Sequence, residues 1–154
     1  MRKILLTCGL LVTTLHFTNA QCTPDPGITE PGIYPDTIQN LPPAFESAAY
    51  SSSLQIRVLT DTTVTQGNVV VSNITVNSVV GLPSGFSYSC NPANCAFPGG
   101  GNGCVSVSGN PAVGSAGTYN IVVNATLNGL LFGFIPVSQP FTKTGYKIVI
   151  HPKP

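Results

Sequence analysis

The segment TYNIVVNATL, residues 118–127, alternates apolar and polar side chains along most of its length. One phase of the alternation holds four apolar residues: Tyr119, Ile121, Val123 and Ala125. A period of two indicates a half-buried β-strand, because successive side chains of a strand point to opposite faces of the sheet. The same alternation occurs in residues 53–59, where Leu54, Ile56 and Val58 share one phase.

Working outward from this segment, the rest of the chain also predicts strands. Residues 69–80 form a longer run rich in β-branched residues. Val71 and Ile74 fall on opposite phases, which predicts either a bulge near residues 72–73 or a bend where the strand crosses between sheets. Four shorter strands are predicted at residues 86–90, 105–107, 130–137 and 146–150. No ten-residue stretch has a helical period, and the strands are separated by Gly-, Pro- and Asn-rich turns. The chain is therefore predicted to be an all-β sandwich of seven or eight strands.

The strongest short turn signal is Asn128-Gly129, a pair that favours the tight turn of a β-hairpin. It predicts that the strand ending near residue 127 returns through residues 130–137. Pro136 would limit that returning strand to an edge or an end of the sheet, because proline has no N–H to donate.

Residues 1–20 have the features of a cleaved secretory signal peptide. Arg2 and Lys3 precede an apolar run at residues 4–17, and a small-x-small cleavage pattern ends at Ala20. The run is shorter than the about 20 residues needed to cross a bilayer, and no later segment qualifies. We therefore expect a secreted or surface-exposed protein, exported through the cleaved signal peptide, with no membrane insertion after cleavage. Acylation of Cys22 is disfavoured by the hydrophilic junction before it.

Charge is scarce, at 7% of the residues. Cleavage would leave four basic and five acidic residues, with no basic stripe, and this argues against a nucleic-acid partner. Residues 21–43 are rich in proline and lack periodicity, so they predict an extended, irregular lead-in. The folded domain is then expected at residues 44–154.

Four cysteines remain after cleavage, and an even number in an exported chain predicts two disulfides. They are Cys22, Cys90, Cys95 and Cys104. Three pairings are possible. Strand phase favours Cys95–Cys104 with Cys22–Cys90, because Cys90 continues an inward phase whereas Cys104 lies out of phase with Val105. A zinc site is the alternative, but the chain has no C-x2-C spacing. The glycine-rich run 99–103, within the cysteine region, reads as a flexible turn.

The remaining chemistry indicates a protein that is not an enzyme and needs no cofactor. Only His151 remains after cleavage as a possible imidazole base, and the five acids are scattered, which favours isolated surface carboxylates over a catalytic pair. No metal site is expected, since no cluster of oxygen ligands is visible. A sugar-binding face would have to use the aromatic residues Tyr34, Tyr50, Phe97, Phe132 and Phe134.

Three short segments carry a family resemblance: GLPSGF at 81–86, VSGNP at 107–111 and AGTY at 116–119. They resemble the immunoglobulin-like repeats of bacterial surface proteins, over roughly residues 46–126. The whole chain also resembles an N-terminal module of secreted Bacteroidetes proteins associated with type IX secretion. The chain departs from the repeats in its inserted cysteine region, 90–104, and in its extra hairpin after residue 127.

The resemblance implies an immunoglobulin-like β-sandwich with a disulfide-bearing loop. It also implies a secreted or cell-surface module for adhesion, spacing or protein interaction, whose partner would be an unknown protein or glycan at the cell surface. A carbohydrate-binding accessory module of an exported protein is the alternative. Binding to glycans would distinguish the two.

Overall fold

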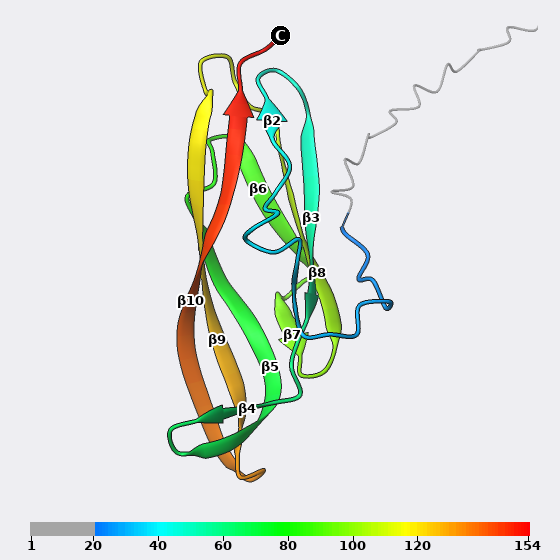
Figure 1. The fold of residues 1–154 in the computed structure, drawn as a ribbon, viewed down its shortest axis with the longest axis vertical. Coiled ribbons are helices and arrows are strands. Elements are labelled where there is room, and N and C mark those ends of the chain that lie inside the picture. The colour runs from blue at the N-terminus through cyan, green and yellow to red at the C-terminus, as the bar shows by residue number, and fades with distance from the viewer. Residues whose placement is uncertain (1–20) are drawn as a thin grey trace, which may run out of the picture.

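The structure is a computed structural model that describes residues 21–154, so the predicted signal peptide lies outside the described residues. These residues form ten strands and no helix, arranged in two sheets (Figure 1). The strands are β1 (Gly32–Tyr34), β2 (Ala44–Phe45), β3 (Tyr50–Arg57), β4 (Asp61–Val64), β5 (Gly67–Val80), β6 (Phe86–Asn91), β7 (Ala96–Pro98), β8 (Asn102–Gly109), β9 (Gly117–Leu131) and β10 (Ile135–His151). The all-β prediction is confirmed.

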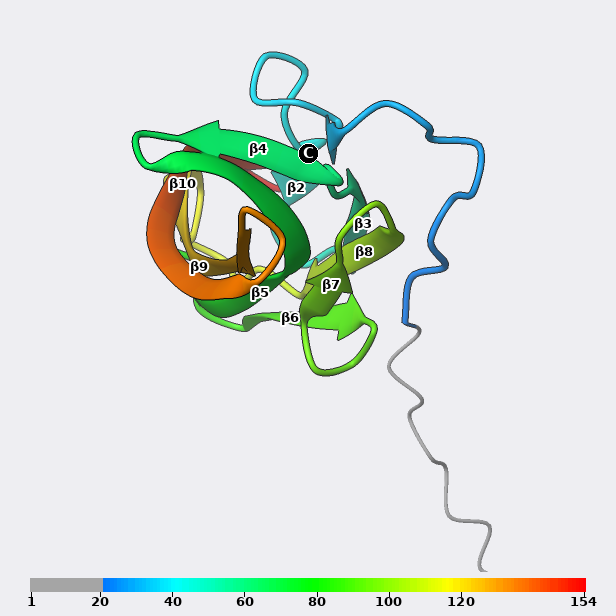
Figure 2. The same cartoon turned by 90° about the horizontal axis from the view of Figure 1, so that it is seen from below.

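The strand order makes the fold an immunoglobulin-like sandwich. One sheet has the order β1-β3-β8-β6, and the other has β2-β10-β9-β5-β4, with β7 also paired to β5. The first order matches strands A, B, E and D of an immunoglobulin domain, and β5, β9 and β10 match strands C, F and G. Viewed from below, β5, β9 and β10 curve around one side, while β3 and β8 lie on the other (Figure 2).

Two local predictions in the long strands are confirmed. The register of β5 against β9 shifts between Val71 and Asn73, where the bulge was expected. Pro136 lies at the start of β10, in a part of the strand that pairs only with β9. Both features are where a sheet tolerates an irregular backbone.

The predicted hairpin at Asn128-Gly129 is wrong. Strand β9 continues through both residues, and Asn128 lies between Asn73 of β5 and Ser138 of β10. The turn comes later, at Phe132 and Gly133, whose φ angles of 54° and 82° are those of a tight hairpin turn. As a result, residues 130–131 belong to β9, whereas residues 135–137 and 146–150, predicted to lie in two strands, belong to the single strand β10.

Gly129 is needed because the backbone of β5 comes close to it, not because the chain turns there. A Cβ atom at this position would lie 2.5 Å from the carbonyl oxygen of Val70, which belongs to the neighbouring backbone. A glycine inside a strand commonly marks such a close approach. The Asn-Gly pair therefore serves the packing of β9 against β5.

Residues 21–43, predicted to be a lead-in to the domain, contribute a strand to the sandwich. β1 pairs antiparallel with β3, and β2 pairs in parallel with β10 at Ile150 and His151. Between β1 and β2, Leu41 is buried in the core. The sandwich therefore begins before residue 44.

Two buried tyrosines hold the segment between β1 and β2. The hydroxyl of Tyr146 donates to the carbonyl oxygen of Pro35 (2.9 Å), and that of Tyr50 donates to the carbonyl oxygen of Pro42 (3.0 Å). Burial, together with the nearby charge of Asp36, raises the pKa of Tyr146 to about 12. Both hydroxyls are therefore held in their neutral, donating form.

Candidate binding sites

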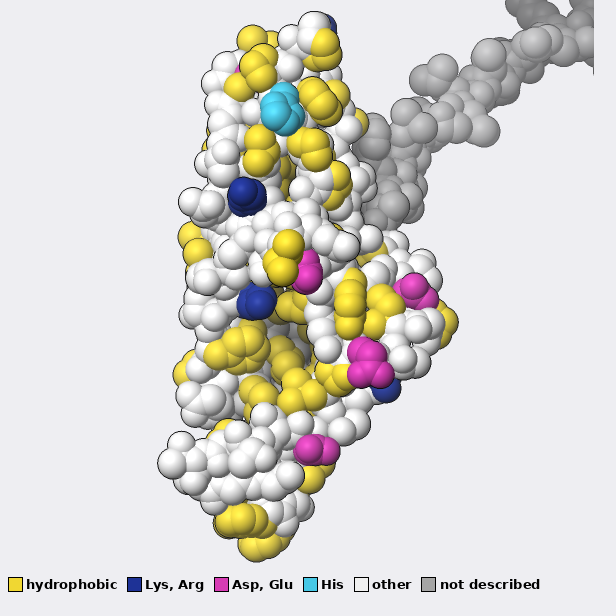
Figure 3. Space-filling view, viewed as in Figure 1, with side chains coloured by type: hydrophobic (Ala, Val, Ile, Leu, Met, Phe, Trp, Pro, Cys, Tyr) yellow, Lys and Arg dark blue, Asp and Glu magenta, His cyan; other side chains and the backbone are white. Residues whose placement is uncertain are grey.

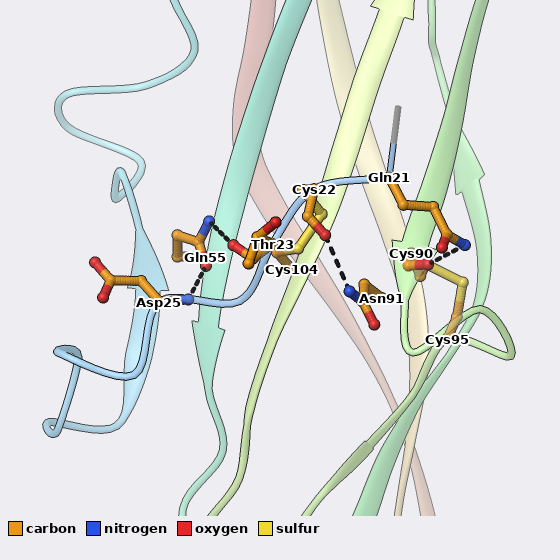
Figure 4. Close-up of a disulfide and its surroundings, with 9 residues drawn as sticks. All are labelled: Gln21, Cys22, Thr23, Asp25, Gln55, Cys90, Asn91, Cys95 and Cys104. Carbon is orange, nitrogen blue, oxygen red and sulfur yellow. Dashed lines mark hydrogen bonds between the residues drawn. A yellow bond between two sulfur atoms is a disulfide. The ribbon is translucent and has the colours of Figure 1, made fainter. Parts of the chain in front are cut away.

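The four predicted cysteines form two disulfides, but the pairing favoured above is wrong. Cys22 is bonded to Cys104, and Cys90 to Cys95 (Figure 4). Cys90 lies opposite Val105 and shares its inward phase, whereas Cys104 lies opposite Asn91 on the other face of the sheet. The lead-in crosses that outer face, so Cys104 is the cysteine that Cys22 can reach.

We call residues 21–28 the N-terminal strap, and hydrogen bonds tie it to β3, β6 and β8. Gln55 donates to the carbonyl oxygen of Thr23 (3.1 Å), and Asn91 donates to that of Cys22 (3.0 Å). Asn102 donates to the carbonyl oxygens of Asp25 and Ile28. The strap covers the outer face of β8, and Cys104 is fully buried. The disulfides indicate that the chain matures in an oxidising compartment.

The cysteine region crosses between the two sheets. Strands β6 and β8 belong to one sheet, while β7, between them, pairs with β5 of the other. Phe97 of β7 is buried in the core against Gly103, where a Cβ would lie 2.2 Å from the Phe97 ring. At Gly99 a Cβ would lie 1.9 Å from the carbonyl oxygen of Val71. The predicted turn is present, with a φ of 66° at Gly100 and a hydrogen bond from Gly101 N–H to the carbonyl oxygen of Pro98, but Gly99 and Gly103 are also needed for close packing.

Within residues 21–154, the carboxylates and His151 form no cluster. Glu46, expected to be a surface acid, is buried, and its carboxylate accepts the N–H groups of Gly114 and Ala116 at 2.9 Å each. The ring of His151 lies 5.5 Å from that of Phe45. Among residues 21–154, no group of three or more His, Cys, Asp or Glu side chains could hold a metal ion. Glu46 stabilises the loop before β9.

The aromatic candidates for sugar binding divide into two groups. Tyr50 and Phe97 are buried, so they cannot contact a ligand from solvent. Tyr34, Phe132 and Phe134 are exposed. Phe132 and Phe134 belong to the turn that joins β9 to β10, at the end of the molecule opposite residue 154 (Figure 1).

This end of the molecule carries exposed apolar side chains that we call the apolar tip. It consists of Val70, Phe132, Phe134 and Ile135, which are 48%, 58%, 73% and 42% exposed. Hydrophobic side chains gather at the lower end of the molecule in Figure 3. Large apolar side chains exposed together at one end of a molecule commonly mark an interaction site.

A second feature is an apolar cavity of about 240 Å³ between the two sheets. One wall comes from β5 and β9 and includes Val76 and Ala125, and the opposite wall includes Leu54 and Val105 of β3 and β8. Lys143 of β10 also lines the cavity. The surface is hollowed between hydrophobic side chains in the lower half of the molecule (Figure 3).

The lower half of β10 has a free edge, because β2 pairs with β10 only at Ile150 and His151. Pro136 and Pro140 lie on this edge strand, four residues apart and therefore in one phase. Prolines in sheets are confined to edges, where the missing N–H faces solvent. They interrupt the row of donors that an added strand would need.

No protein-family model matches the chain, and no curated protein matches it with significant similarity. None of the described residues belongs to a helix that could span a membrane.

Proposed function

We propose that this protein is a secreted or cell-surface, non-catalytic immunoglobulin-like module that binds a partner protein through its apolar tip. The predicted signal peptide and the two disulfides support export. Loops and hairpins at the ends of a sandwich can contact partners without disturbing the core.

The observation that carries this proposal is the exposure of two phenylalanines on a hairpin whose backbone is fixed. The N–H of Phe132 donates to the carbonyl oxygen of Asn68 (2.9 Å), which ties the turn to β5. The side chains of Phe132 and Phe134 are nevertheless 58% and 73% exposed. Aromatic side chains held in this way lose little conformational freedom on binding, and such residues dominate the energetics of many interfaces.

The composition of the tip indicates the chemistry of the partner. Its four members are uncharged and apolar, so a protein partner should offer an apolar pocket or groove, not a charged surface. The tip lies far from residue 154, at the opposite end of the long axis (Figure 1). It is therefore accessible when the other end is attached to a surface or a neighbouring module.

The test is saturable binding of the purified protein to intact cells of the producing organism. The double variant Phe132→Ser, Phe134→Ser should weaken binding at least tenfold, since buried aromatic anchors contribute about 2 kcal/mol or more each. Val113→Ser is the matched control, because Val113 is 79% exposed but lies in the loop before β9, at the other end. Protease treatment of the cells should abolish binding. Unchanged binding by a folded double variant would refute the proposal.

Carbohydrate binding is the second candidate, favoured by the polar residues beside the tip. On the outer face of the sheet, Asn128 donates to Asn73 (3.0 Å) and accepts from Ser138 (2.9 Å). Sugar sites combine an aromatic platform with hydrogen-bonding side chains. If a glycan array gives binding that the phenylalanine double variant loses and protease treatment of cells leaves intact, the ligand is a glycan.

A further inference from the structure

The apolar cavity is a feature that the proposed tip interaction does not use. Protein interiors are close-packed, and voids larger than a water molecule are few. A cavity of about 240 Å³ is larger than the engineered cavity of about 150 Å³ that stays dry and binds benzene. Its size and lining are therefore those of a ligand site.

The wall on the β5-β9-β10 sheet is built from cross-strand rows. Ala125 lies between Val76 and Phe141 in one row, and Val123 lies opposite Lys143 in the next. The small side chain of Ala125, which is buried, leaves room in the middle of this wall. A larger residue there would fill the cavity without altering the exposed surface.

The opposite wall comes from the other sheet. Leu54 and Ile56 of β3 and Val105 of β8 line it. With apolar side chains on both walls, the interior offers water few hydrogen-bond partners, so an alkyl chain is a better occupant than water.

The cavity is reached from the side of the sandwich where the first strand is split. β1 pairs only with β3, and β2 reaches only the last residues of β10. No strand therefore covers the lower half of β10, where Phe141 is 40% exposed and Lys143 is also exposed. The two residues line the cavity and also face solvent.

The occupant is not an added β-strand. Pro136 and Pro140 remove hydrogen-bond donors from the free edge of β10, on which a strand would have to pair. A small molecule has no such requirement. Two cations line the cavity, Arg57 and Lys143, and both favour a ligand with a negative headgroup. The guanidinium of Arg57 donates to Asn102 (2.7 Å), whereas Lys143 lies on the exposed edge of β10, so the headgroup is placed beside Lys143.

We propose that the cavity binds a single-chain amphiphile, with its alkyl tail between the sheets and an anionic headgroup beside the Nζ atom of Lys143. If about 150 Å³ holds the six carbons of benzene, then 240 Å³ holds a tail of about ten carbons. A medium-chain carboxylate such as decanoate has this size and charge.

The test uses decanoate itself and measures its binding to the folded protein by calorimetry and native mass spectrometry. Saturable binding of one decanoate per chain is expected. Ala125→Leu adds three carbons inside the cavity, and it should weaken binding at least tenfold, because each displaced methylene contributes about 0.8 kcal/mol, roughly a fourfold change in affinity. Val76→Phe, on the neighbouring strand β5 of the same wall, fills the same space if Ala125→Leu does not fold. Absence of one-to-one binding, or binding that both folded cavity variants leave unchanged, would overturn the proposal.

A second arm tests the headgroup. Lys143→Gln should weaken decanoate binding two- to fivefold, as expected for a partly solvated ion pair, and should leave the binding of 1-decanol unchanged. Equal loss for both ligands, or no loss for decanoate, would refute an anionic headgroup beside Lys143. The double variant Phe132→Ser, Phe134→Ser should bind decanoate normally, so the outcome is independent of the tip interaction.

Discussion

Removal of the Cys22–Cys104 disulfide should destabilise the protein far more than removal of the Cys90–Cys95 disulfide. The two bonds join residues separated by 82 and 5 positions in the sequence. In the chain-entropy model, a cross-link stabilises the fold by restricting the unfolded chain, and the effect grows with the logarithm of loop length. The model gives about 4.5 kcal/mol for the long loop and about 2.1 kcal/mol for the short one near room temperature.

The native structure should change little when the long-range bond is removed. The strap keeps its hydrogen bonds from Gln55, Asn91 and Asn102, so it remains on the outer face of the sheet. Alanine at the fully buried position 104 replaces the sulfur with a small gap. Most of the loss should therefore come from the greater freedom of the unfolded chain.

The assay is urea unfolding of the double variants Cys22→Ala, Cys104→Ala and Cys90→Ala, Cys95→Ala. The first should be about 2 kcal/mol less stable than the second, and its m-value should increase because its unfolded state is more expanded. Peptide mapping without reduction should recover the Cys22–Cys104 and Cys90–Cys95 peptides from the wild type. Equal losses, or a larger loss for the short loop, would show that local packing outweighs chain entropy and would refute this reasoning.

Three further predictions test the fold by urea or thermal unfolding. Gly129→Ala should lower the free energy of unfolding by about 2–3 kcal/mol, because its Cβ would meet the backbone oxygen of Val70. Gly133→Ala, in an open turn with φ of 82°, should lower it by about 1 kcal/mol. Equal losses would contradict the close-approach explanation. Glu46→Ala should lower the free energy of unfolding by about 3 kcal/mol, because it leaves two N–H groups without their acceptor, and Glu46→Gln should lower it less. A loss below about 1 kcal/mol for Glu46→Ala would contradict the role of this carboxylate in holding the loop. The fold raises the pKa of Tyr146 from 10.0 to about 12, so the stability that this group contributes is complete below pH 10 and is lost as the pH rises toward 12. Tyr146→Phe should therefore flatten the fall in Tm over that range. Parallel curves of Tm against pH for the variant and the wild type would contradict this prediction.

Alternation in the sequence predicted the strands well because one face of each sheet packs in the core. Residues 53–59 and 118–127 overlap β3 and β9, and the bulge after Val71 follows from the change of phase. These features depend on side chains close together in the sequence. Local pattern is sufficient for them.

The hairpin prediction failed because a local turn preference competed with long-range pairing. Asn128 and Gly129 favour a turn in isolation, but β9 pairs with β5 and β10 along most of its length, on both sides of these residues. Ending the strand at residue 127 would remove the pairs that residues 128–131 make with β5 and with β10. Tertiary pairing therefore decided where the chain turns.

The disulfide pairing failed for a related reason. The phases assigned to Cys90 and Cys104 were correct, since the two face opposite sides of the sheet. Phase alone does not decide the pairing, because a cysteine on the outer face can also be buried. The strap covers the outer side as well, and nothing in the alternation of β8 indicates a segment that lies 82 residues earlier in the sequence. The cavity is equally invisible in sequence, because it depends on how side chains from two sheets fit together.

The prolines of the lead-in explain why the first strand is split and why one side of the cavity is uncovered. A continuous strand along β10 would cover the mouth, but Pro35 follows β1, and Pro42 and Pro43 precede β2. Proline cannot donate to a ladder, so the segment between β1 and β2 leaves the sheet and is held instead by the hydroxyls of Tyr50 and Tyr146. The exposed edge of β10 carries its own prolines, which oppose pairing with a foreign strand. The side of the sandwich is therefore open to a small molecule and closed to strand addition, and this combination distinguishes a ligand cavity from an incomplete sheet.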